Sequence, residues 1–284
     1  MKSLLRVLGA LVLVSGIVAY VVWQRPEPPV IPPPAPKEVV LQYADGSKMW
    51  SSFDGGFRPP PLVSKVFREL DQAKVPYDSL RVSGAVVRTT IDARAQSVAA
   101  TVIGRLAEPQ RKLGVSVTAI DPASGAVLVY TGGSRQEVDM AGGVITTPSP
   151  GIVEPFAAVP DLVQPTMSPL DVNVAYATVA AGGVLREPRF VNSVTAADGS
   201  VLHKAIDNGK PVFGRDIADR ITAGLKEKAG CNGAACVTGA YPWLAGYTPE
   251  LAVTVFILEQ AGAVVDDPDL PRVIWQEFLA TMAG

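Results

Sequence analysis

The hydrophobic positions of the chain are concentrated first at its N-terminal end. Residues 7–23 contain no charged side chain, and with two leucines just before them they are long enough to cross a hydrocarbon core of about 30 Å as a helix. Lys2 and Arg6 precede this stretch, so the positive-inside rule places the N-terminus in the cytoplasm and the remainder of the chain outside. A cleaved signal peptide is the alternative, but no convincing cleavage pattern ends the stretch. Residues 1–25 are therefore predicted to be a cytoplasmic tip and a single transmembrane anchor.

The next residues, 26–38, are dominated by proline. Proline at this density favours a polyproline II spacer that rises about 3.1 Å per residue and has no internal hydrogen bonds. We therefore predict a semi-rigid linker that holds the folded part of the chain away from the membrane. A ligand for a proline-binding partner is the less favoured interpretation.

Beyond the linker, hydrophobic positions alternate with a period of two in some stretches and of 3.6 in others, which predicts a mixed α and β domain. One long helical stretch places Val63, Val66, Phe67 and Leu70 on a single face. Turn signals such as Asp-Gly and Asp-Pro-x-x-Gly separate pairs of strands into hairpins. The predicted helices are 62–80, 93–106, 167–183, 216–228 and 271–282, and the predicted strands or hairpins are 39–50, 84–92, 115–133, 188–204 and 251–259.

Composition narrows the classes of function. The formal net charge of −2 gives no electrostatic case for binding nucleic acid. The two cysteines, Cys231 and Cys236, lie in one short loop, where an exported protein is expected to form a disulfide, with two buried free thiols as the alternative. The one histidine, His203, is in a separate predicted hairpin, and two thiolates alone do not complete a zinc shell. We therefore expect no metal and no cofactor.

Several stretches resemble the transpeptidase domain of bifunctional, class A penicillin-binding proteins. Residues 89–96 (TTIDARAQ) resemble the family's Thr-Thr-Ile-Asp-x-x-x-Gln, and 115–133 resemble its first two core strands. Residues 167–183 resemble its Thr-Pro-Leu-containing helix, and 243–249 its Trp-Phe-x-Gly-Tyr-Thr-Pro stretch. The resemblance implies an α+β fold, with a transpeptidase/β-lactamase-like antiparallel sheet flanked by helices.

The same resemblance divides the chain beyond the linker. Residues 39–110 would form the lead-in strands and helices, and 111–284 the transpeptidase-like domain. No stretch like the family's glycosyltransferase domain follows the linker.

The resemblance fails at the family's three catalytic motifs. Where the family reads Pro-Gly-Ser-Thr-Phe-Lys-Pro-Phe, this chain is one residue shorter and has Ile152, Val153 and Glu154 in place of the nucleophilic serine and its activating lysine. The Ser-x-Asn motif and its helical subdomain have no counterpart, because only 157–166 are available for them. The Lys-Thr-Gly motif aligns with Val237, followed by the retained pair Thr238-Gly239.

These losses predict an inactive pseudo-transpeptidase of the bacterial cell membrane, which serves cell-wall synthesis as a scaffold or regulator. The deleted subdomain would leave an apolar flank of the sheet uncovered for a protein partner. The first alternative is a non-covalent module that binds peptidoglycan peptides in the remnant cleft through Thr238 and Gly239. The second is a penicillin-binding transpeptidase with a displaced nucleophile, Ser149 or Thr147, but neither has a base at helical spacing.

Overall fold

The structure is a computed structural model, and the description below concerns the compact unit formed by residues 36–284. The predicted anchor and Cys231 lie outside the described residues, so the anchor and the disulfide stay predictions. Within the part of the chain that is described, no helix combines the length and apolar character needed to cross a membrane. The described residues are 35–54, 58–107, 113–132, 138–229, 236–259 and 267–283.

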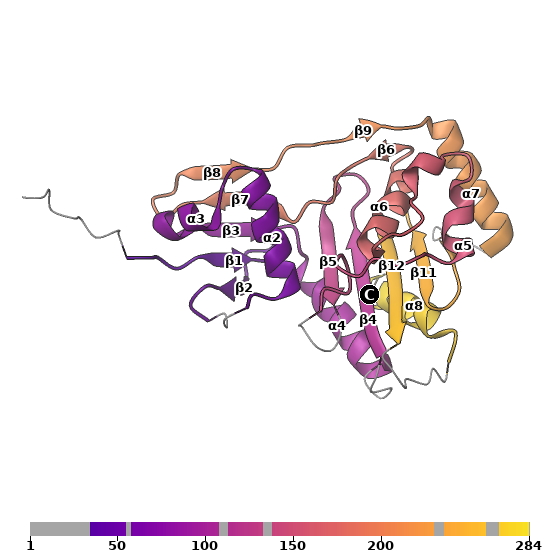
Figure 1. The fold of residues 1–284 in the computed structure, drawn as a ribbon, viewed down its shortest axis with the longest axis horizontal. Helices are drawn as coiled ribbons and strands as arrows, with labels where there is room; N and C mark the ends of the chain where they lie inside the picture. Colours follow the sequence, from indigo (N-terminus) through magenta and orange to yellow (C-terminus); the bar gives the residue numbers. More distant parts are fainter. Residues whose placement is uncertain are drawn as a thin grey trace, which may run out of the picture. The chain divides into compact units, whose positions relative to one another are not determined.

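A smaller sheet is formed by the N-terminal strands and a hairpin from the middle of the chain (Figure 1). The predicted hairpin at 39–50 is confirmed, and Gly46 adopts a φ of 93° in its turn. β3 pairs in parallel with β1 and antiparallel with β7, so residues about a hundred positions apart are neighbours. The strand order is β2-β1-β3-β7-β8, with β1 at Val40–Gln42, β2 at Lys48–Ser51, β3 at Val86–Thr89, β7 at Val191–Thr195 and β8 at Val201–Lys204.

The single helix predicted for 62–80 is wrong, because the structure has two helices there. α2 spans Pro61–Gln72 and α3 spans Tyr77–Ser83. Lys74 lies between them with a φ of 64°, which a right-handed helix cannot contain, and the Val75-Pro76 step prevents the helix from continuing.

A larger antiparallel sheet carries the main core. Its central strands, β4 and β12, pair over eight residues and are buried on both faces. The helix α6 covers one face, while α4 and α8 cover the other (Figure 1). The order is β10-β11-β12-β4-β5, with β10 at Cys236–Thr238, β11 at Trp243–Tyr247, β12 at Ala252–Glu259, β4 at Leu113–Ile120 and β5 at Val127–Gly132.

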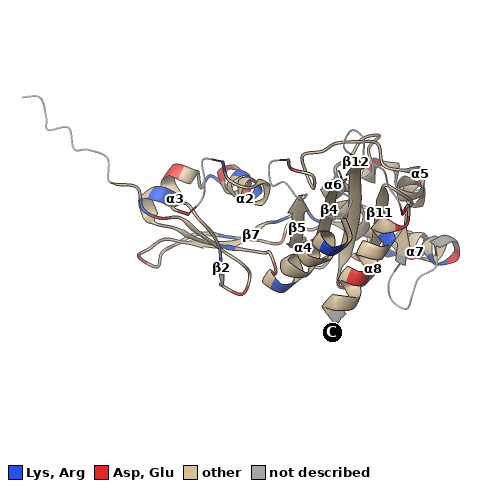
Figure 2. Cartoon of the chain, turned by 90° about the horizontal axis from the view of Figure 1, so that it is seen from below, with Lys and Arg blue, Asp and Glu red and all other residues tan. Residues whose placement is uncertain are grey.

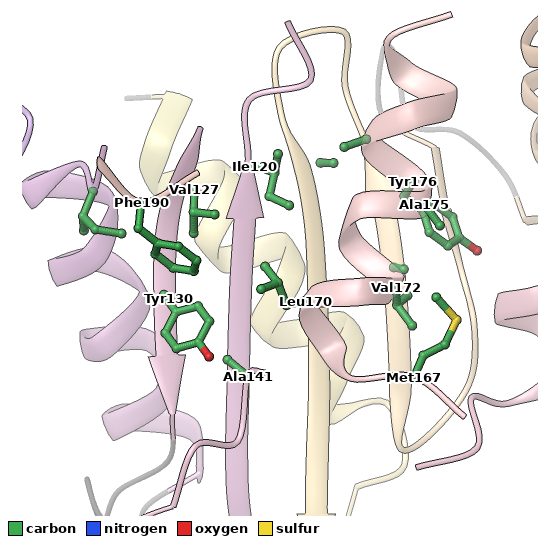
Figure 3. Packing of buried hydrophobic residues seen from close by; sticks show 14 of the residues in the cluster. Ile120, Val127, Tyr130, Ala141, Met167, Leu170, Val172, Ala175, Tyr176 and Phe190 are labelled. Carbon is green, nitrogen blue, oxygen red and sulfur yellow. The ribbon is translucent and has the colours of Figure 1, made fainter. Parts of the chain in front are cut away.

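The central helix α6, Pro169–Ala180, is buried nearly all round, which explains its apolar sequence. Ser168 and Asp171 form a capping box at its start, and Pro169 occupies the first helical position. Figure 3 shows its side chains Leu170 and Val172 within the cluster that also contains Ile120 of β4. The fold class predicted from the sequence, an antiparallel α+β sheet flanked by helices, is therefore confirmed.

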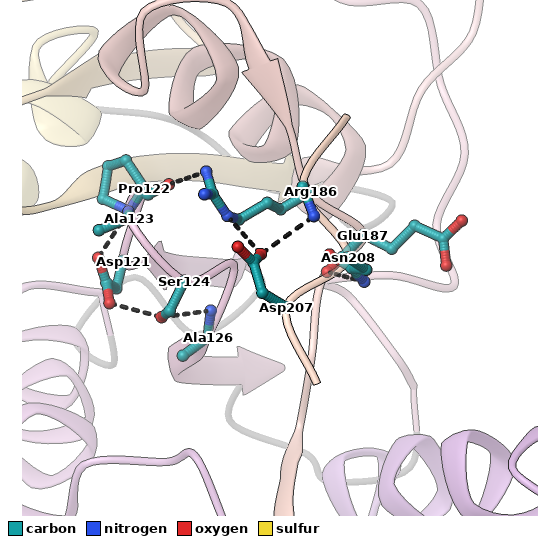
Figure 4. A network of polar contacts seen from close by, with 10 residues as sticks. Asp121, Pro122, Ala123, Ser124, Ala126, Arg186, Glu187, Asp207 and Asn208 are labelled. Atoms are coloured by element: carbon teal, nitrogen blue, oxygen red, sulfur yellow. Dashed lines mark hydrogen bonds and ion pairs between the residues drawn. The ribbon is translucent and has the colours of Figure 1, made fainter. Parts of the chain in front are cut away.

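The remaining elements complete the helical and loop layers. Asp92 caps α4 by accepting a hydrogen bond from the Ala95 N–H at 2.7 Å. Arg186 donates to the Pro122 carbonyl oxygen and to the Asp207 carboxylate, and so ties the β4–β5 turn to the loop before β9 (Figure 4). These elements are α4 at Ala93–Ala107, α5 at Pro150–Val153, η1 at Glu154–Phe156, η2 at Pro160–Leu162, β6 at Val184–Leu185, β9 at Lys210–Pro211, α7 at Arg215–Ala229 and α8 at Leu270–Ala283.

Candidate functional site

The segment that aligns with the family's nucleophile is the short helix α5 followed by the 3-10 turn η1. Ile152 is 1% exposed, and its carbonyl oxygen accepts a hydrogen bond from the Tyr176 hydroxyl of α6 at 2.9 Å. The ring of Phe156 packs edge-on against Tyr176, with 5.1 Å between the ring centroids. The segment is thus anchored in the core by its apolar residues.

Strand β10 lies directly against this segment. The Thr238 hydroxyl donates to the Gly151 carbonyl oxygen at 3.1 Å. Gly239 has a φ of 116°, and a Cβ there would lie 2.8 Å from Ile152 Cδ1 and 2.5 Å from the Trp243 carbonyl oxygen. The retained Thr-Gly pair therefore serves close packing of β10 on α5, and only glycine fits at the second position.

Val237, which aligns with the motif's lysine, packs on the opposite side of the sheet from Thr238. It is 6% exposed and belongs to the buried cluster beneath α4 and α8, together with Leu244 and Trp275. Successive side chains of a strand point to opposite faces, so Val237 and Thr238 cannot both face α5 in a regular strand. The structure thus brings Ile152, Thr238 and Gly239 together but places Val237 in the core.

Beside α5 lies a groove of about 360 Å³, which we call the remnant groove. Thr238 supplies its one hydroxyl, which donates to Gly151. Its cation, Arg220, pairs with Asp216 at 2.9 Å. The Glu154 side chain is exposed at the rim. Small or apolar side chains from α5, η1 and α7 make up the rest: Gly151, Pro155, Ala157, Ala158, Ile221, Gly224 and Leu225.

The contribution of α7 to this groove was not foreseen from the sequence. The helix was predicted from its periodicity, but nothing in that pattern places it beside α5. One signal was available in Gly224, because a glycine in the middle of an amphipathic helix weakens it and often has a packing reason. A Cβ at Gly224 would meet no atom within 4 Å, so this position opens onto free space.

The alternative nucleophiles lie elsewhere. Ser149 and Thr147 line a separate cavity of about 290 Å³ next to Tyr241 and Glu259. The Ser149 hydroxyl is buried and has no hydrogen-bond partner among the described residues. The Tyr241 hydroxyl donates to the Glu259 carboxylate at 2.7 Å, and burial raises its pKa. A serine nucleophile needs a base in contact with its hydroxyl, and the described residues offer Ser149 none.

The described residues contain no group of three or more His, Cys, Asp or Glu side chains that could hold a metal ion. Cys236 begins β10, but Cys231 lies outside the described ranges.

Comparison with curated proteins gives partial matches of one kind. The chain is 30% identical over 145 residues to penicillin-binding protein 1A of Mycolicibacterium smegmatis, and 32% identical over 146 residues to that of Mycobacterium tuberculosis. Each match covers 40% of this chain and 18% or 17% of the relative, so the chain matches less than a fifth of these longer proteins. Penicillin-binding protein 2D of Bacillus subtilis is 29% identical over 161 residues, 45% of this chain and 22% of that protein. No family model matches the chain.

Solved structures match over a larger share. The D,D-transpeptidase domain of a peptidoglycan glycosyltransferase from Eggerthella lenta gives a TM-score of 0.66 at 12% identity, covering 87% of this chain and 98% of that one. PonA1 of M. tuberculosis in complex with penicillin V gives 0.63 at 20% identity, covering 79% and 93%. At these identities the likeness concerns the fold.

Proposed function

Because the chain has the fold of the transpeptidase domains of penicillin-binding proteins, we propose that it is a catalytically inactive member of that group. In this proposal it is anchored in the bacterial cell membrane by residues 1–25. Its folded part lies outside the cytoplasm and acts as a scaffold or regulator of peptidoglycan synthesis by binding another protein of that machinery.

One observation carries the proposal, namely the character of the remnant groove. Acyl transfer to a serine needs a nucleophile, a base and hydrogen-bond donors for the developing oxyanion in mutual contact. At the point where α5 meets β10, the contact is made by the backbone of Gly151 and Gly239 and by the Thr238 hydroxyl, which is already donated to Gly151. The apolar lining of the remnant groove beside this contact suits the binding of a hydrophobic partner surface better than it suits acyl transfer.

The test of inactivity is covalent labelling. We expect that the full chain, in native membranes, is not labelled by a fluorescent penicillin under conditions that label an active penicillin-binding protein in the same sample. Labelling of the chain would overturn the proposal, and its loss on Ser149→Ala would identify the displaced nucleophile.

The test of the scaffold role is to fill the groove. Gly224→Leu projects a side chain into the groove without a steric clash, and it raises helix propensity by roughly 0.5–1 kcal/mol, so α7 is expected to remain folded. Ala223→Leu, an exposed neighbour that does not line the groove, is the matched control. Cross-linked pull-downs from native membranes should capture a cell-wall synthesis protein with the wild type and the control but not with Gly224→Leu.

The same variants separate the alternative binding function. If the chain sediments with purified sacculi and captures no membrane protein, and Gly224→Leu abolishes that sedimentation, the groove binds peptidoglycan and the scaffold proposal is wrong. Retention of Thr238 and Gly239 is weak support for this alternative, since both are used in packing β10 on α5.

A further inference from the structure

A second cavity, far from the remnant groove in sequence, lies at the start of α2. It has a volume of about 580 Å³, and three consecutive prolines, Pro59 to Pro61, form part of its wall. Arg58, Lys65 and Arg68 supply the cations, and Asp139 is the one acidic residue in its lining. Three positive charges against one negative leave a local charge of +2, in a chain whose formal net charge is −2. We call this cavity the basic pocket.

Lys65 and Asp139 form the fixed part of the basic pocket. The Lys65 ammonium lies 3.3 Å from the Asp139 carboxylate and donates to the Gly142 carbonyl oxygen at 3.1 Å. Asp139 also accepts hydrogen bonds from the Tyr130 hydroxyl at 2.6 Å and from the Gly142 N–H at 3.0 Å. The side chains of Lys65 and Asp139 are only 14% and 24% exposed. The Asp139 carboxylate is therefore already paired within the protein.

Arg58 and Arg68 are the two cations of the basic pocket that can bind a ligand. Both are exposed, and neither has an ion-pair partner among the residues that the structure describes. Basic residues of α2 are visible in Figure 2. The guanidinium group presents a planar fork of N–H donors that matches the two oxygens of a carboxylate or a phosphate. An anionic ligand is thus the complement of this surface.

The other wall of the basic pocket favours a peptide over a phosphate group. Pro60 has polyproline II angles, φ −55° and ψ 155°, and the prolines present ring faces that suit apolar side chains. The carbonyl oxygen of Pro59 accepts no backbone hydrogen bond within the described part of the chain. A peptide brings N–H donors for this carbonyl oxygen together with carboxylates for the arginines, whereas a phosphodiester brings acceptors only.

We propose that the basic pocket binds an acidic peptide segment of a partner protein, with its carboxylates on Arg58 and Arg68 and its apolar side chains on the prolines. This interface shares no residue with the remnant groove and stands independently of it. Binding through exposed charge pairs is screened by salt, so the affinity should fall steeply as ionic strength rises.

The experiment is a selection from a random dodecapeptide library displayed on phage, against the full chain in a neutral detergent. The Arg58→Glu/Arg68→Glu double variant serves as the depletion step. We expect the selected peptides to be enriched in Asp and Glu, and to lose about tenfold in affinity on the double variant. Lys226→Glu, an exposed cation on α7, is the matched charge control and should leave their affinity unchanged.

Two results would overturn the proposal. One result is that the selected peptides are not enriched in Asp and Glu, or that acidic peptides bind the double variant as tightly as the wild type. The other result is that no acidic peptides are selected, while the wild type binds phosphatidylglycerol vesicles and the double variant does not. This result would show that the pocket binds lipid headgroups. Both arginines are exposed, and equal thermal unfolding midpoints of the variants and the wild type will show that the fold is intact.

Discussion

The hydroxyl of Thr238 donates a hydrogen bond to the carbonyl oxygen of Gly151 across the line where β10 meets α5. The two residues are 87 positions apart in the chain, and each belongs to a segment that resembles a catalytic motif of the transpeptidase fold. In this chain their contact is structural: it closes α5 onto the edge of the larger sheet.

Thr238→Val keeps the shape of the side chain but removes the donor, so the Gly151 carbonyl loses its partner. The bond is partly buried, and we expect the free energy of unfolding to fall by about 1 kcal/mol. Urea unfolding followed by circular dichroism measures this change. Thr238→Ser retains the hydroxyl and should restore most of the loss; equal effects of both substitutions would show that the methyl contact matters instead.

Gly151→Ser tests whether the groove lacks only a hydroxyl. A Cβ at this position would lie 3.7 Å from Gly239 Cα and 4.0 Å from Thr238 Oγ1, which is ordinary contact, so the variant should fold. We expect no labelling by fluorescent penicillin, because the lysine that activates the family's nucleophile has no counterpart in the groove, whose cation, Arg220, cannot act as a base. Gly151→Ala is the control for folding. Covalent labelling of Gly151→Ser would show that a usable base is present after all.

Val237→Lys restores the lysine of the third motif in sequence, but the structure predicts destabilisation rather than activity. The substitution puts an unpaired ammonium group into the buried cluster of Leu244 and Trp275, at a cost of roughly 3–5 kcal/mol. Burial lowers the pKa of a lysine, so the folded chain binds the proton less tightly and the variant should gain stability as pH rises toward about 10. Thermal unfolding across this pH range, with Val237→Leu as the control, measures the effect. A Val237→Lys variant as stable as the control would show that the side chain reaches solvent.

Local signals in the sequence were enough to predict the elements whose ends carry their own hydrogen-bonding residues. The α6 helix begins at Ser168 because the capping box satisfies its first N–H groups, and Asp92 does the same for α4. The break at Lys74 was missed, since hydrophobic periodicity continues through it while the backbone turns to a positive φ. Such a turn becomes visible in sequence mainly when glycine occupies it.

Long-range pairing was the other part that the sequence could not supply. Nothing in the pattern of 188–204 says that β7 pairs with β3, so that Val86 lies opposite Thr195. Both this pairing and the packing of α4 against α8 join residues from the two sides of residue 110. The division of the chain into 39–110 and 111–284 stays a prediction. In the same way, the resemblance aligns Val237 with the lysine of the Lys-Thr-Gly motif. The face of the sheet that Val237 occupies, however, depends on the register of β10 against β11.

Glu69 gives the fold a predicted pH dependence. Its carboxylate accepts hydrogen bonds from the Phe190 N–H at 2.6 Å and the Val191 N–H at 3.2 Å, and so links α2 to β7. Burial raises the pKa of Glu69 above its usual 4.5, against the smaller opposing effect of these donors. The folded chain therefore holds this proton more tightly than the unfolded chain does. The stabilisation is complete below the usual pKa and is lost as pH rises through the raised value.

Glu69→Gln removes this titration, so its stability should depend less on pH than that of the wild type as pH rises above the usual pKa of 4.5. The wild type should lose stability relative to the variant as pH rises, by about 1.4 kcal/mol for each unit by which the pKa is raised. Urea unfolding at a series of pH values measures the difference, and the exposed Glu250→Gln serves as the matched control. A difference that is constant with pH would mean that Glu69 titrates alike in the folded and unfolded chains, and that its two backbone hydrogen bonds balance its burial.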